Sequence, residues 1–140
     1  MKTKILQTPF VTVLFLFGFL FIGNFTKAQS DENVTVYFSA SVSTRDYKTT
    51  VVSPLFSAVI PDTSYARSMV ATDFKDAFYK YVMGEMGVDV SVGVRIEGPK
   101  EDRQQVENDR QETMKRERVQ KRDIVHTYSS FYYSFDTSKL

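Results

Sequence analysis

The sequence predicts an α+β domain with a four-stranded, mostly antiparallel sheet and two helices on one face of it, in two layers. Three observations predict this class. Apolar and polar residues alternate over 34–42 and again over 88–96, and apolar residues recur at helical spacing over 66–82. With two further β-rich runs, the predicted order is β-β-α-β-α-β. The alternating strands each have one polar face, so that face is expected to be open to solvent.

The first two strands are expected to form a hairpin. Val34 to Val42 alternate as in a half-buried strand, and a β-rich run follows from Thr49 to Ile60. The polar segment 44–48 links them and is short enough for direct pairing. Pro54 has no backbone N–H to donate to a ladder, so the second strand is expected to lie at an edge or to be bulged at this residue.

The first helix is expected to begin at the N-cap residues Asp62, Thr63 or Ser64 and to end near Gly84. Its apolar stripe consists of Ala66, Val70, Phe74, Ala77, Phe78, Tyr81 and Val82. The third strand, 88–96, is expected to stop at Gly98-Pro99, because proline suits the first turn of a helix.

A highly charged helix is expected from about Lys100 to Arg122, followed by a final strand from Ile124 to Phe135. The charged helix carries both signs along its length. Such a surface is typical of a solvated face, and docking of a partner is the alternative.

Residues 1–28 have the pattern of a signal peptide. Lys2 and Lys4 precede an apolar run from Phe10 to Ile22, and Thr26-Lys27-Ala28 places small residues around a cleavage site. We therefore expect export to the periplasm or extracellular space and a single mature domain over residues 29–140. The protein would then contact the membrane only transiently, through its signal peptide. An uncleaved membrane anchor over Ile5–Phe25 is the alternative.

Charge and cysteine content restrict the class of partner and the source of stability. Loss of Lys2, Lys4 and Lys27 with the leader changes 18 basic and 17 acidic residues to 15 and 17, a net charge of −2. Nucleic-acid binding requires a basic footprint, so no nucleic-acid partner is expected. The chain has no cysteine, so its stability must come from packing without disulfides.

No recognised catalytic or metal-binding pattern is present. His126 is the only histidine, and no Gly-x-Ser-x-Gly turn occurs, so no metal, cofactor or catalytic residue is assigned and the chain is not expected to be an enzyme. A small hydrolase that uses His126 with a nearby serine or carboxylate is the alternative.

The segment from Val90 to Tyr133, a strand ending in Gly98-Pro99, then a helix and a strand, resembles the second half of the SPOR (sporulation-related) domain. The resemblance covers about a third of the chain, and the N-terminal half departs from the family pattern. It implies a ferredoxin-like sheet packed on two helices that binds peptidoglycan glycan strands on the sheet. It assigns no binding residue.

The polar faces of the strands supply a possible ligand surface. Thr35 and Ser41 belong to this face, and its candidate ligand residues are Tyr37, Ser39, Ser91, Arg95, His126, Tyr128 and Tyr132. Hydroxyls, a guanidinium and tyrosine rings suit a polar ligand with apolar ring faces, such as a glycan. An ordinary solvated sheet face is the alternative. The expected function is a non-enzymatic binding or interaction module whose partner is an envelope protein or a glycan.

Overall fold

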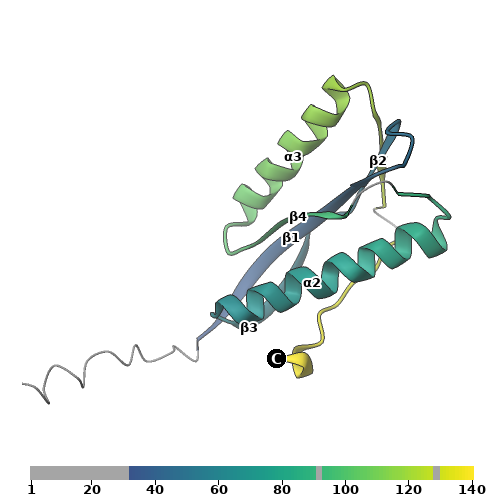
Figure 1. The fold of residues 1–140 in the computed structure, drawn as a ribbon. Coiled ribbons are helices and arrows are strands. Elements are labelled where there is room, and N and C mark those ends of the chain that lie inside the picture. Colours follow the sequence, from purple (N-terminus) through teal and green to yellow (C-terminus); the bar gives the residue numbers. More distant parts are fainter. Residues whose placement is uncertain (1–31, 91–92, 128–129) are drawn as a thin grey trace, which may run out of the picture. The chain divides into compact units, whose positions relative to one another are not determined.

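The computed structural model describes residues 32–90, 93–127 and 130–140, which belong to the unit Asp31–Leu140 (Figure 1). The α+β class and the order of helices and strands agree with the prediction, except that the second predicted strand, Thr49–Ile60, is divided into two. The elements are β1 (Asn33–Ser43), β2 (Thr49–Val52), β3 (Phe56–Pro61), α2 (Ser64–Lys80), the π-helical turn η1 (Tyr81–Glu85), β4 (Arg95–Lys100), α3 (Arg103–Val119), β5 (Asp123–His126) and the 3-10 turn η2 (Thr137–Lys139). The leader predicted at residues 1–28 lies outside the described residues.

The predicted hairpin is present, and its second strand is bulged at Pro54. β1 pairs antiparallel with β2 at its C-terminal end and with β3 along its N-terminal half. Ser53 N donates to Ala40 O at 2.9 Å, whereas Phe56 already faces Phe38. Pro54 and Leu55 therefore lie opposite the single residue Ser39. This is a β-bulge, and it places the proline where no ladder donor is needed.

The remaining strands pair at opposite edges of the hairpin. β4 runs antiparallel along the other side of β1, with Ser39 opposite Glu97 and Ser41 opposite Arg95. β5 runs parallel to β2, from Thr49 opposite Asp123 to Val52 opposite His126. The sheet is thus mostly antiparallel with one parallel pair.

The third strand differs in extent from the predicted 88–96. The ladder begins at Arg95 and passes through Gly98-Pro99 to Lys100, and Val90 makes a single bridge to Thr44. Gly98-Pro99 is therefore inside the strand and does not end it. The pair is accommodated by a register shift between Tyr37 and Ser39, and Gly98 has φ +94°, a conformation that glycine adopts without strain.

The last strand is also shorter than predicted, ending at His126 where Ile124 to Phe135 was expected. Continuing the parallel pairing would bring the chain opposite Pro54, which has no N–H to donate. Among the described residues, the last backbone bond to this edge runs from Thr127 N to Val52 O at 3.1 Å.

Both helices begin at side-chain caps. The Thr63 hydroxyl accepts from Ala66 N at 3.0 Å, as predicted for α2, and α2 with η1 ends at Glu85, next to the predicted Gly84. Asp102 caps α3 by accepting from Gln105 N at 3.0 Å. The helix is shorter than the predicted 100–122 because Pro99 and Lys100 belong to β4.

The two helices lie on opposite faces of the sheet, so the predicted two-layer arrangement with both on one face is wrong (Figure 1). Phe38 packs against Phe74 of α2, with ring centroids 4.7 Å apart. The neighbouring Ser39 points the other way and pairs with Glu97, which accepts from Thr113 of α3 at 2.8 Å.

The chain path gives the physical reason. The crossovers β3–α2–β4 and β4–α3–β5 each join parallel strands, and they traverse the sheet in opposite directions. Connections between parallel strands of one sheet are right-handed in nearly all proteins. Two right-handed connections that cross the sheet in opposite directions place their helices on opposite faces of it.

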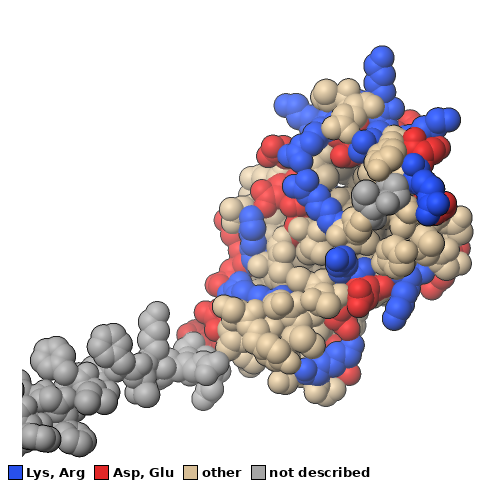
Figure 2. All heavy atoms as spheres, in the orientation of Figure 1, with Lys and Arg blue, Asp and Glu red and all other residues tan. Residues whose placement is uncertain are grey.

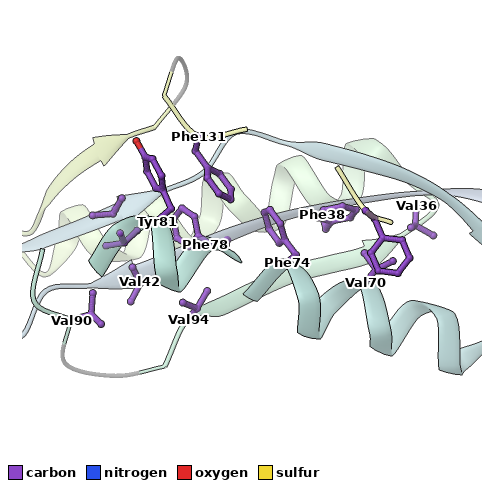
Figure 3. Close-up of a cluster of buried hydrophobic side chains, with 14 of the residues drawn as sticks. Val36, Phe38, Val42, Val70, Phe74, Phe78, Tyr81, Val90, Val94 and Phe131 are labelled. Carbon is purple, nitrogen blue, oxygen red and sulfur yellow. The ribbon is translucent and has the colours of Figure 1, made fainter. Parts of the chain in front are cut away.

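The α2 side holds an aromatic core (Figure 3). The predicted helical stripe is buried there, and the segment after β5 adds Phe131 and Phe135. Phe131 lies 5.3 Å from Phe78 and 5.0 Å from Tyr81, measured between ring centroids. Phe131 and Phe135 were predicted to belong to the last strand. They are buried in the core as that alternation predicts, but their backbone does not join the ladder.

Candidate binding surface

The sheet face that was predicted to be wet is covered along half its length by α3, through polar contacts. Arg110, buried to 5% exposure, donates from Nε to Ser53 O at 3.1 Å and pairs through Nη1 with Glu107 at 3.0 Å. Thr50 Oγ1 donates to Glu117 Oε2 at 2.8 Å. The buried apolar side chains of α3 are Val106 and Met114. The Arg110–Glu107 pair lies within α3, whereas the hydrogen bonds of Arg110 and Glu117 join α3 to the sheet beside these two apolar side chains.

Ser39, a predicted ligand residue, lies under α3 with an exposed fraction of 1%. The prediction that this side chain lies on an open surface is therefore wrong. Its hydroxyl has no hydrogen-bond partner within the described part of the chain. The gap beside it, bounded by Glu97, Arg110 and Thr113, has no room for a water molecule. The sequence showed the polar face of this strand, but it did not show that a charged helix would cover it.

The other half of the same face is open, and we call it the open corner: Thr35 and Tyr37 of β1 with Ser57 and Val59 of β3. Thr35 pairs with Val59 and Tyr37 pairs with Ser57, so the four side chains form one contiguous patch. Thr35 and Ser57 are exposed, Val59 is 57% exposed and Tyr37 is half-buried. The patch offers three hydroxyls beside a flat ring and an apolar side chain.

Ser57 and Val59 were not among the predicted ligand residues. Their position could have been found by continuing the period of two through the second strand, because Phe56, Ala58 and Ile60 face the core. The register of the hairpin then places them beside Thr35 and Tyr37.

The other predicted ligand residues do not join the open corner. Arg95 is exposed on β4, where its Nε donates to Glu97 Oε1 at 2.7 Å. Tyr132 is 93% exposed in the segment after β5. Ser91 and Tyr128 lie outside the described residues.

His126 is half-buried on β5, and its surroundings oppose a positive charge. Burial lowers the pKa of the imidazole, and the nearby charges of Arg110 and Arg118 lower it further. In a catalytic triad a carboxylate stabilises the charged imidazole, whereas Arg110 and Arg118 act on the pKa of His126 in the opposite direction.

A groove of about 480 Å³ opens beside the turn between β1 and β2, lined by Thr44, Arg45, Asp46, Thr49, Val88 and Asp89. Its charged groups are bonded to neighbouring groups of the protein. Arg45 Nε lies 3.0 Å from Asp89 Oδ2, and Asp46 accepts from Thr44 Oγ1 and Lys48 N, which lowers the pKa of its carboxyl. These contacts stabilise the turn and engage the charged groups of the groove within the fold.

The surface over α3 carries charges of both signs, as predicted, with basic and acidic side chains interspersed in the view of Figure 2. Within residues 32–90, 93–127 and 130–140, no group of three or more acidic, histidine or cysteine side chains could hold a metal ion. In the same part of the chain, no helix is long and apolar enough to cross a membrane.

No protein-family model matches the chain, and no curated protein or solved structure shows significant similarity to it. The resemblance of residues 90–133 to the SPOR domain therefore stays a prediction.

Proposed function

We propose that residues 29–140 form an exported, non-enzymatic binding module of the cell envelope or extracellular space. The open corner is the observation that carries this proposal. It is the part of the predicted ligand face that α3 leaves exposed, and it combines Tyr37 with Thr35, Ser57 and Val59 in one patch. The leader pattern of residues 1–28 supports export.

A cell-wall glycan is the ligand class that suits this patch. The hydroxyls of Thr35, Tyr37 and Ser57 can each donate and accept hydrogen bonds with sugar hydroxyls. The ring of Tyr37 and the methyl groups of Val59 offer apolar surface to the ring faces of a sugar. The charged neighbour of the patch, Lys100 of β4 opposite Tyr37, is paired with Asp109 at 2.6 Å, which favours a neutral glycan over an acidic one.

Binding is tested by co-sedimentation of residues 29–140 with insoluble cell-wall glycan, since the unit Asp31–Leu140 contains its own core. We expect Tyr37→Ala to weaken binding by about 1–2 kcal/mol, roughly 5- to 30-fold, as for a central aromatic contact. Tyr79→Ala is the matched control, because Tyr79 is 42% exposed on α2, at the opposite face.

Equal loss in both variants would reject the open corner as the site, and no binding by the unmutated domain would reject the glycan.

Replacing His126 with Ala separates a binding module from a hydrolase, because a module keeps its binding and only a hydrolase loses a measured turnover. The intact mass of the exported protein tests the leader. Retention of residues 1–28 would indicate an anchored protein.

A further inference from the structure

β3 has an outer edge that no described strand pairs with. Its inner edge pairs with β1 over six residue pairs, from Asn33 opposite Pro61 to Phe38 opposite Phe56. β5 pairs with the outer edge of β2, and this pairing reaches only to Val52, before β3 begins. Along Phe56–Pro61 the outward N–H and C=O groups therefore lack a ladder partner in the part of the chain that the structure describes. Such an edge is a template for another strand.

The other two edges of the sheet carry charges or are short, whereas β3 is uncharged and has its proline and the Pro54 bulge only at its ends. β4 has three charged residues, Arg95, Glu97 and Lys100, and is interrupted by Gly98-Pro99. β5 has four residues and begins with Asp123. β3 has six residues without a charge, and its proline is at the last position. Charges, prolines, bulges and short length are the usual protections of an edge strand.

Apolar side chains are exposed beside this edge. Val59 projects from β3 on the open-corner side with 57% of its surface exposed. On the core side, Phe131 and Tyr133 lie 5.5 and 6.0 Å from the ring of Phe56, and Tyr132 between them is 93% exposed. A strand added to β3 would cover part of this apolar surface.

We propose that the added strand is β3 of a second copy, paired antiparallel about a two-fold axis, so that two sheets become one. A two-fold axis through the edge makes the two strands antiparallel and the contact self-complementary. Since Phe56–Pro61 is uncharged, no like charges oppose self-pairing. An axis near Ala58 brings the Val59 side chains of both copies to the same face of the joined sheet.

The contact area sets the expected affinity. A six-residue edge with its flanking side chains falls below the roughly 1,200–2,000 Å² buried in stable specific interfaces. We therefore expect a reversible dimer with a dissociation constant in the micromolar range. This inference is independent of the proposed function, because its readout is mass and requires no ligand.

Sedimentation velocity of residues 29–140 over about 1–500 μM, a range that brackets micromolar affinity, tests the inference. The unmutated domain should change from monomer to dimer across this range, and V59K should remain monomeric. V119K is the matched control, since Val119 is 77% exposed on α3, and it should dimerise normally. Ser57→Lys, at the other exposed position of β3, provides a second test should V59K fail to fold.

Amide exchange gives a second readout. The amides of residues 56–60 should exchange more slowly at high concentration, with no comparable change in β4. A domain that stays monomeric throughout, a V59K variant that dimerises as tightly as the unmutated domain, or pairing only with a strand of another protein would each overturn the inference.

Discussion

Replacing Gly98 with alanine tests the close contact between β4 and β1. A Cβ atom at this position would lie 2.4 Å from Tyr37 O and 3.1 Å from Phe38 Cα. Both are backbone atoms of the central strand, so the contact can be relieved only by moving β4 away from β1. The conformation of Gly98, φ +94°, adds a separate cost for any residue with a side chain.

Alanine variants of two other glycines separate the conformational cost from the steric cost. Gly87 has φ +65° with no atom within 4 Å of a built Cβ, so G87A measures the conformational cost alone, about 1–3 kcal/mol. Gly93 has neither a positive φ nor a close atom, so G93A should have an effect near zero. G98A carries at least the conformational cost of G87A, since φ +94° lies outside the left-handed α region, and it also displaces β4, so we expect a total loss of about 3–5 kcal/mol.

Urea unfolding of the three variants, followed by circular dichroism, measures these differences. A loss of this size is a large fraction of the roughly 5–15 kcal/mol that stabilises a typical domain. It should lower the melting temperature by at least about 10 °C. Equal destabilisation in G98A and G87A would refute the argument that backbone contact with β1 requires glycine.

Three further changes give expected outcomes in urea unfolding. Thr63→Ala removes the side-chain cap of Ala66 N and should cost about 1 kcal/mol, whereas the adjacent exposed Ser64→Ala should cost less. Ser39→Ala removes a buried hydroxyl that lacks a partner, so stability should stay unchanged or rise by up to about 1 kcal/mol; a clear loss would mean that the hydroxyl is bonded. Lys139 lowers the pKa of Asp73 below its ordinary 3.8, so this pair stabilises the fold above that value and the contribution is lost as pH falls through the lower folded pKa. Asp73→Asn should therefore flatten the acid side of the pH–stability curve, and an unchanged curve would refute the role of the pair.

The class of fold could be predicted because local patterns encode it. The alternation along β1, the stripe of α2 and the interruption at Pro54 depend on residues close in sequence, and each has its expected structural counterpart. The positions of the helices depend on the directions of two crossovers, which no local pattern contains. α3 was expected to be exposed because it is charged, yet its Arg110 and Thr113 bond to polar groups of the sheet.

The ends of strands were the least predictable feature, for the same reason. Val88 to Ile96 alternate well, but the ladder begins at Arg95, where β1 provides a partner. The aromatic residues that follow β5 alternate as a strand would, and Phe131 and Phe135 are buried accordingly. Their backbone does not join the ladder, because the parallel pairing of β5 ends where the neighbouring strand reaches Pro54. Thus alternation indicated the buried side chains correctly, while the pairing required the partner strand.

The polar contact between α3 and the sheet implies that this domain can open in stages. Releasing α2 would expose a cluster of phenylalanines, each worth about 1.5–3 kcal/mol of burial. Releasing α3 exposes only two buried apolar side chains, Val106 and Met114, and otherwise exchanges hydrogen bonds within the protein for bonds to water, at about 0.5–1.5 kcal/mol each. Amides of Arg103–Val119 should therefore exchange with solvent through a sub-global opening, while β1 and α2 exchange only on complete unfolding. The partly open form would hydrate a row of serine and threonine hydroxyls and keep the aromatic core closed, so transient opening adds little risk of aggregation.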